Sequence, residues 1–126
     1  MARELKPVDA GAAANLMKDG ALMVDVREAG EHAQARIPGS QNIALSRLEV
    51  SELPLGPDQA VVFFCAGGGR TTAHASRLAA KAGAAEAYVM RGGISAWGQA
   101  GLPIERGGAG QGERGPRGGF FSRLLG

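Results

Sequence analysis

Three short apolar segments, at 21–26, 60–64 and 87–90, constrain the fold of this chain more than any other feature. Each is nearly continuous in apolar residues, which is typical of strands that are buried on both faces of a sheet. Segments with helical spacing lie between them. This alternation predicts an α/β domain with a central, mostly parallel β-sheet flanked by helices, in which ligands bind at the carboxyl ends of the strands.

The connecting segments carry helix and turn signals. Asp9 can cap a helix over 10–18, and Gly20 can end that segment. A second long helix is expected over 70–82, with Gly83 at its end. The remaining expectations are short helices at 28–35, 46–53 and 94–99, a turn at 37–40 and a brief strand at 42–44.

The length of 126 residues allows one domain with a substantial core, and we expect that domain to span 1–106. The last 20 residues differ, because they hold 8 of the 21 glycines. We expect 107–126 to be a flexible Gly- and Arg-rich tail, since it cannot bury enough apolar surface to offset its ordering entropy. Its apolar end at 120–125 is either an unordered terminus or a segment that docks on this domain, a partner or a membrane surface.

The formal net charge of +2 comes from the tail, which holds three arginines against one glutamate. The rest of the chain is formally neutral. A neutral body offers no extended basic field for phosphates, so we expect no nucleic-acid partner.

Cys65 is the only cysteine in the sequence. This excludes an intramolecular disulfide and a cysteine-rich zinc site, and we expect no metal or cofactor. A lone cysteine suits a reducing compartment. The N-terminus starts no apolar run, and no apolar stretch approaches the roughly 20 residues that span a bilayer. We therefore expect a soluble, cytoplasmic protein with no membrane span.

The strongest chemical signal is the loop after the second apolar segment. Cys65 follows that segment directly, and after it come Ala66, Gly67, Gly68, Gly69, Arg70 and Thr71. The glycines let successive N–H groups turn inward, and the helix that starts at Arg70 adds partial positive charge, so the pKa of Cys65 should be lowered. The alternative is an inert cysteine in a strand-to-helix turn, although such a turn needs neither three glycines nor an arginine.

A thiolate in this loop can attack the outer sulfur of a donor such as thiosulfate and hold that sulfur as a persulfide. A thiol or cyanide can then accept the sulfur. Because the chain has no second cysteine, release needs an external nucleophile. The charge of Arg70 suits a sulfur oxyanion or a carboxylate, which leaves thiosulfate, 3-mercaptopyruvate and a protein persulfide as candidate donors.

The chain resembles the rhodanese family of sulfurtransferases in four ordered segments: Asp25-Val26-Arg27-Glu28 with Glu31, Ile37-Pro38-Gly39-Ser40 with Asn42-Ile43, Cys65 through Thr71, and Arg91 through Trp97. The resemblance implies a rhodanese-like three-layer domain in which Cys65 carries the persulfide and the amides of 66–70 cradle it. It implies that Arg70 contacts the substrate or orders the loop. Asp25 and Arg27 look like supports of the loop, and an ordinary ion pair explains them equally well.

The sequence departs from the family pattern at two places. Ala35-Arg36 stand where the family often has Gly-His, and His32 stands where an aromatic residue is frequent. These changes concern the packing of a turn more than the chemistry.

Three other functions remain open. A cysteine phosphatase or an arsenate reductase needs five residues between its cysteine and arginine, whereas four separate Cys65 from Arg70. A sulfur-relay module would pass its persulfide to an acceptor protein, with 107–126 as the docking element. A domain that has lost catalysis is disfavoured, because both Cys65 and Arg70 are present.

The remaining polar and aromatic residues receive structural interpretations. We expect His32 and His74 to face solvent and Trp97 to anchor the core. We expect Gly92-Gly93 to form a turn or to shape the rim of the pocket.

Overall fold

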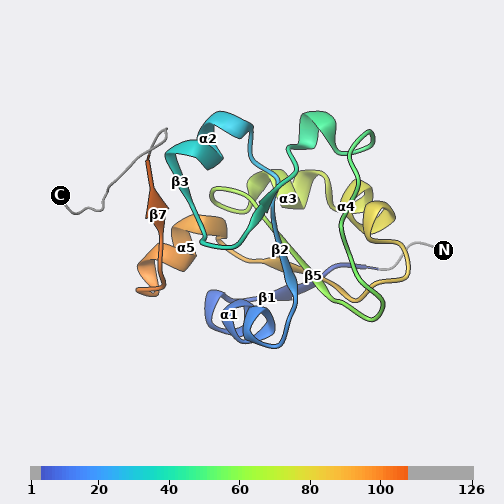
Figure 1. Ribbon diagram of the computed structural model, residues 1–126, viewed down its shortest axis with the longest axis horizontal. Coiled ribbons are helices and arrows are strands. Elements are labelled where there is room, and N and C mark those ends of the chain that lie inside the picture. The colour runs from blue at the N-terminus through green and yellow to red at the C-terminus, as the bar shows by residue number, and fades with distance from the viewer. Residues whose placement is uncertain (1–3, 108–126) are drawn as a thin grey trace.

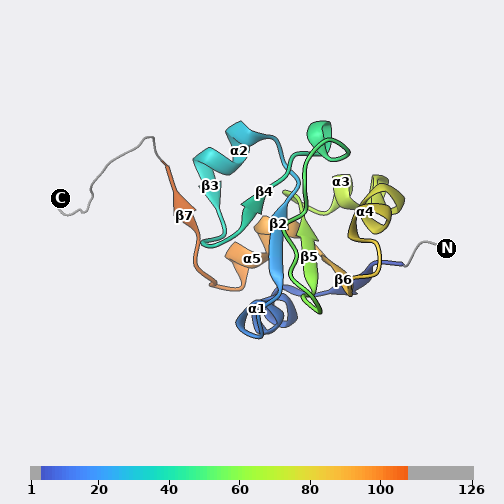
Figure 2. The same cartoon turned by 45° about the vertical axis from the view of Figure 1, so that its right-hand side comes forward.

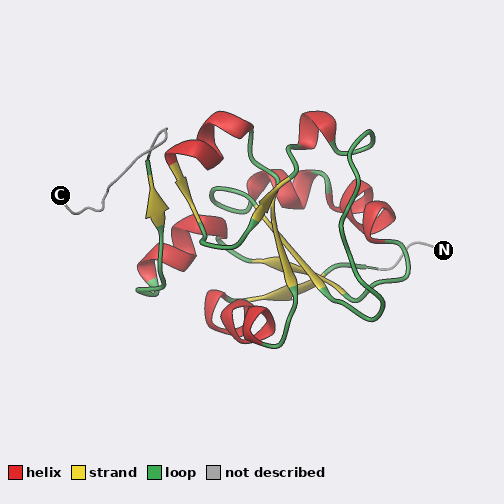
Figure 3. Ribbon diagram, viewed as in Figure 1, coloured by secondary structure: helices red, strands yellow, loops and turns green. Residues whose placement is uncertain are grey.

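The expected alternation of strands and helices is present in the computed structural model, which describes residues 4–107 (Figures 1 and 3). The strands are β1 Lys6–Val8, β2 Leu22–Asp25, β3 Ala35–Arg36, β4 Gln41–Asn42, β5 Val61–Phe64, β6 Ala87–Met90 and β7 Glu105–Arg106. The helices are α1 Ala10–Lys18, α2 Ala29–Gln34, the 3₁₀ helix η1 Leu45–Arg47, α3 Gly69–Ala73, α4 Ala75–Ala82 and α5 Gly93–Gln99.

Five of the strands form one parallel sheet in the order β1-β6-β5-β2-β4, with β5 at its centre. β2 and β5 pair in register from Leu22 with Val61 to Asp25 with Phe64. This arrangement confirms the expected α/β class with a mostly parallel central sheet flanked by helices. Apart from this sheet, β3 and β7 pair as a short antiparallel ribbon.

Helices cover both faces of the sheet, which explains why its strands are continuously apolar (Figure 2). On one face, Val62 and Phe64 of β5 pack with residues of α1 and α5, among them Trp97. On the other face, Val61 and Phe63 pack with Leu78 of α4 and with the segment around η1. Trp97 is buried and its indole N–H donates to the Pro103 carbonyl at 2.7 Å, so its expected role as a core anchor is confirmed.

The carboxyl ends of the parallel strands meet at one edge of the sheet. β2 ends at Asp25, β5 ends one residue before Cys65, and β6 ends one residue before Arg91. Asp25, Cys65 and Arg91 therefore lie at the same edge, which is where ligands bind in this class of fold.

The helix expected at 46–53 was wrong. Only the 3₁₀ helix η1 forms there, in which the Leu48 N–H donates to the Leu45 carbonyl at 3.3 Å. The Leu45 carbonyl accepts from the Arg77 guanidinium at 2.8 Å, and the Arg47 carbonyl accepts from the Ser51 hydroxyl at 2.7 Å. Val50 is 77% exposed, so this segment presents no continuous apolar helical face to the core.

The helix expected at 70–82 is two helices, α3 and α4, which meet at His74 with a φ of −116°. α3 holds Thr71 beside Cys65, whereas α4 packs Leu78 and Ala82 on the sheet. The bend at His74 lets each helix take the direction that its own contacts require.

Three short strands, β1, β3 and β7, were absent from the sequence-based prediction.

Among residues 4–107, no helix has the length and apolarity to cross a bilayer. Apart from Gly107, the tail expected at 107–126 lies outside the described residues, so the division into a domain at 1–106 and a tail stays a prediction.

Candidate active site

Cys65 follows the central strand, and its thiol is enclosed by the loop that comes after it. Its side chain is buried, and Sγ accepts a hydrogen bond of 3.1 Å from the Gly68 N–H. The Thr71 hydroxyl lies 3.7 Å from the same sulfur. Gly68 has a φ of +102°, which residues with a side chain rarely adopt, so glycine is required where the loop turns back towards Cys65.

Two opposing effects set the pKa of the Cys65 thiol. Burial raises it, whereas hydrogen bonds from the amide and hydroxyl of Thr71 and from the amides of Gly68 and Arg70 lower it. The hydrogen bonds outweigh burial, so the pKa of Cys65 lies below its ordinary value. A thiolate is the nucleophilic form of cysteine, and the loop therefore favours the reactive state.

The start of α3 is fixed by two threonine hydroxyls. The Thr72 hydroxyl donates to the Gly68 carbonyl at 2.8 Å. The Thr71 hydroxyl lies 3.1 Å from the same carbonyl and 3.7 Å from Cys65 Sγ, so its one proton can be donated to either acceptor. Gly67 and Gly69 are exposed, and a Cβ at either position would meet nothing within 4 Å. These two glycines are therefore on the open side of the loop, and their small size is not demanded by packing.

Helix α5 holds the backbone at the start of the loop, at Cys65 and Ala66. The Ile94 N–H donates to the Cys65 carbonyl at 2.9 Å, and the Ser95 N–H donates to the Ala66 carbonyl at 3.0 Å. A Cβ at Gly93 would lie 2.2 Å from the Cys65 carbonyl oxygen and 2.5 Å from that of Ala66. Gly93 is thus needed for this close approach, and Gly92-Gly93 is more than a plain turn.

Arg70 forms a bidentate ion pair with Glu31 of α2. The two guanidinium–carboxylate distances are 2.8 Å and 2.9 Å. This hydrogen bonding to Arg70 lowers the pKa of Glu31 to about 2, against the opposing effect of burial. This ion pair joins the Cys65 loop to α2.

Asp25 and Arg27 form a buried ion pair beside the site. The Arg27 guanidinium donates to Asp25 Oδ2 at 2.8 Å and to the Ala35 carbonyl at 2.5 Å, and its backbone N–H donates to Asp25 Oδ1. Asn42 donates to the backbone carbonyls of both residues. Such a network fixes the end of β2, because each buried charge keeps its partners.

His32 belongs to the same network, and the expectation that it faces solvent was wrong. Its Nδ1 lies 2.9 Å from Asp25 Oδ2, and its side chain is 19% exposed. The imidazole fits this place because it can reach a carboxylate, whereas a phenyl ring could not bond to it. His74 is half-buried and contacts the Arg77 guanidinium at 3.1 Å, so it does not simply face solvent either.

Sequence reasoning gave no role to Glu31 beyond its place in a motif, and left the role of Gly93 open. The Arg70–Glu31 ion pair joins residues 39 positions apart, and no local pattern connects them.

Within residues 4–107, no three His, Cys, Asp or Glu side chains are grouped so that they could hold a metal ion.

Comparisons with known proteins agree with this geometry. The family model for the rhodanese-like domain matches residues 9–100. A curated sulfurtransferase from Allochromatium vinosum is 32% identical over 83 residues, covering 66% of this chain and 77% of that protein. The chain spans 48% of the length of another curated relative, an uncharacterised protein from Synechocystis.

Two solved structures show the same fold. The thiosulfate sulfurtransferase of Pseudomonas aeruginosa superposes with a TM-score of 0.69 at 25% identity, over 85% of this chain and 21% of that one. A protein of unknown function from Rhodopseudomonas palustris, described as a "possible tyrosine phosphatase", gives a TM-score of 0.62 at 33% identity, over 80% and 85% of the two chains.

Replacing Gly93 by alanine should destabilise the protein and disturb the loop. The new Cβ would overlap the Cys65 carbonyl at a backbone φ of +59°, so we expect the free energy of unfolding to fall by about 2–4 kcal/mol. Gly101→Ala is the control, because Gly101 has a φ of +78° with nothing within 4 Å of the added Cβ, and it should lose only roughly 1–2 kcal/mol. Equal losses in urea unfolding would contradict the claimed contact.

Replacing Thr71 by valine should raise the pKa of Cys65, because the valine cannot donate to the thiolate. The pH dependence of alkylation of Cys65 by iodoacetamide measures this, and its midpoint should move to higher pH than in the wild type. Thr71→Ser keeps the hydroxyl and should keep the wild-type midpoint. A valine variant with an unmoved midpoint would show that the hydroxyl has no effect on the thiol.

Proposed function

Since the chain belongs to the rhodanese-like domain family, we propose that it is a sulfurtransferase that carries a sulfane sulfur as a persulfide on Cys65. Thiosulfate is the donor that we propose for the first half of the reaction, and cyanide or a thiol is the acceptor for the second. The curated sulfurtransferase among its relatives supports the reaction class.

One observation carries the proposal: the only cysteine of the chain lies in a ring of backbone N–H groups that lower the pKa of its thiol. Such a ring stabilises a thiolate before the reaction and a second, negatively charged sulfur after it. No acid–base side chain is needed, because a persulfide transfers without a proton passing to an oxygen or nitrogen leaving group.

In the first step, the Cys65 thiolate attacks the outer sulfur of thiosulfate. A sulfur–sulfur bond forms to Cys65, the original sulfur–sulfur bond breaks, and sulfite leaves with its electron pair. In the second step, cyanide attacks the outer sulfur of the persulfide and leaves as thiocyanate, which returns Cys65 to its thiolate. Each step is a displacement at sulfur and consumes no outside oxidant or reductant.

The surrounding charges have positioning roles in this proposal. Arg70 and Glu31 tie the loop to α2, while Asp25 and Arg27 hold the neighbouring strand end. Ala66 supports the ring by its carbonyl bond to α5, and Gly68 and Thr71 contact the sulfur directly. A small sulfur donor therefore meets an ordered loop whose charges are already paired.

A phosphatase is the second candidate, because one similar structure is described as a possible tyrosine phosphatase. Two observations count against it. Only four residues separate Cys65 from Arg70, and Arg70 is paired with Glu31, whereas phosphate binding calls for a free arginine at the loop.

A sulfur relay to an acceptor protein uses the same persulfide, and its expected docking tail at 107–126 lies outside the described residues. Deleting 108–126 would separate relay from small-molecule turnover.

Intact mass spectrometry after incubation with thiosulfate tests the proposal. The wild type should gain the mass of one sulfur atom, about 32 Da, and lose it on addition of cyanide as thiocyanate appears. Cys65→Ala should gain nothing, and Thr72→Val, whose side chain touches the loop but not the sulfur, should still gain it. Absence of the added sulfur together with aryl phosphate hydrolysis that Cys65→Ser abolishes would favour the phosphatase instead.

A further inference from the structure

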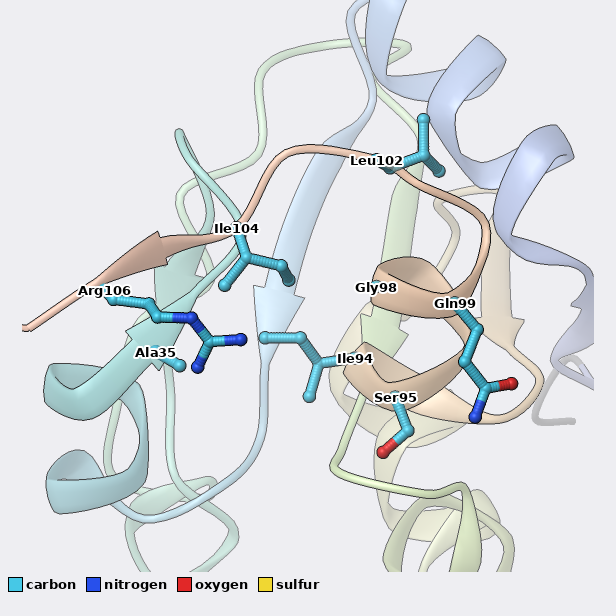
Figure 4. Close-up of a pocket in the computed structure, with 8 residues that line it drawn as sticks. All are labelled: Ala35, Ile94, Ser95, Gly98, Gln99, Leu102, Ile104 and Arg106. Atoms are coloured by element: carbon cyan, nitrogen blue, oxygen red, sulfur yellow. The ribbon is translucent and has the colours of Figure 1, made fainter.

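A pocket of about 510 Å³ lies between α5 and the ribbon formed by β3 and β7 (Figure 4). Its apolar walls come from Ile94 of α5 and from Leu102 and Ile104 in the segment that follows that helix. Small-molecule sites in proteins have volumes of about 300–1,000 Å³, with apolar walls and a few polar groups. The pocket is therefore of a size and composition that suit a small organic ligand.

The pocket adjoins the candidate active site on two sides. Ile94 and Ser95, which line it, are the residues whose N–H groups hold the carbonyls of Cys65 and Ala66. Ala35, on the opposite wall, accepts the hydrogen bond from Arg27. A ligand in this pocket would thus lie beside the loop that carries the reactive cysteine.

The pairing register of the ribbon directs one arginine into this pocket. Arg36 pairs with Glu105, and the ion pair between them lies on one face of the ribbon. Ala35 pairs with Arg106, so these two side chains lie on the other face, because side chains alternate along a strand. Figure 4 shows the Arg106 guanidinium pointing towards Ile94, past the small side chain of Ala35.

Arg106 has an unmatched charge within the described part of the chain. Arg27, Arg36, Arg70 and Arg77 each form an ion pair with a carboxylate, whereas no hydrogen bond or ion pair of the Arg106 side chain occurs within residues 4–107. A guanidinium recognises a carboxylate with two parallel hydrogen bonds. The pocket accordingly offers a cation beside an apolar wall, and an anionic organic molecule complements both.

We propose that this pocket binds the sulfur acceptor, a low-molecular-weight thiol that carries a carboxylate, with its carboxylate at Arg106 and its carbon chain against Ile94 and Ile104. An inorganic donor has no carbon body and would gain nothing from these walls. The acceptor thiolate attacks the outer sulfur of the Cys65 persulfide. A new sulfur–sulfur bond forms on the acceptor, the bond to Cys65 breaks, and the electron pair returns to Cys65 as a thiolate.

This inference rests on the proposed sulfurtransferase function. It is tested by measuring how fast protein that carries a persulfide on Cys65 loses the added sulfur to different thiols. The protein is first loaded with thiosulfate and freed of excess donor. The rate of sulfur loss is then measured with 3-mercaptopropionate and with its neutral amide, which has the same shape. The ratio of the two rates is compared between variants, because intrinsic differences between the thiols cancel in that comparison.

Arg106→Gln should lower this ratio about three- to tenfold relative to the wild type, and Arg106→Lys should restore part of it. Lys18→Gln is the control for loss of one positive charge, because Lys18 is an exposed residue at the end of α1 that lines neither this pocket nor the one beside the Cys65 loop, and it should keep the wild-type ratio.

A wild-type ratio in Arg106→Gln, or an equal fall in Lys18→Gln, would overturn the assignment of the acceptor site while leaving the sulfurtransferase function intact. Failure of the wild type to load any sulfur would instead overturn both.

Discussion

The conformation of the Cys65 loop depends on the approach of α5 to its backbone. The N–H groups of Ile94 and Ser95 donate to the carbonyls of Cys65 and Ala66, so both oxygens are hydrogen-bonded to α5. The approach is allowed only because residue 93 has no side chain. With those carbonyls engaged, N–H groups further along the loop can face Sγ, and the stabilisation of negative charge on sulfur follows from that arrangement.

Two arginines near the Cys65 loop are paired with carboxylates. Arg70 pairs with Glu31 and joins the Cys65 loop to α2, whereas Arg27 pairs with Asp25 at the end of β2. Breaking one member of the buried pair would leave the other without a partner, which costs more than the pair contributes. We therefore propose Arg106, which forms no ion pair within residues 4–107, and not the paired Arg70, as the residue that binds an anionic ligand.

Much of the fold could be predicted, because its signals are local. Continuous apolar runs predicted β2, β5 and β6. Asp9 predicted the start of α1, and the Asp9 carboxylate accepts a hydrogen bond from the Ala12 N–H at 2.8 Å. The loop after Cys65 was also predicted, since three glycines and then Arg70 come shortly after the cysteine. What failed depends on contacts that no local pattern indicates: the Leu45 carbonyl of η1 accepts from the Arg77 guanidinium, and His32 contacts the Asp25 carboxylate. The two-residue strands of the ribbon carry too few residues for a periodic pattern.

The central claim is that backbone N–H groups of the loop, and no side-chain cation, hold the transferred sulfur. A crystal structure of the thiosulfate-treated protein tests this most directly, because it locates the added sulfur atom. We predict an extra sulfur bonded to Cys65 Sγ within hydrogen-bond distance of amides between Ala66 and Thr71, with the Arg70–Glu31 pair unbroken. A sulfur bound to a freed Arg70 guanidinium, with the loop amides turned away, would contradict the account.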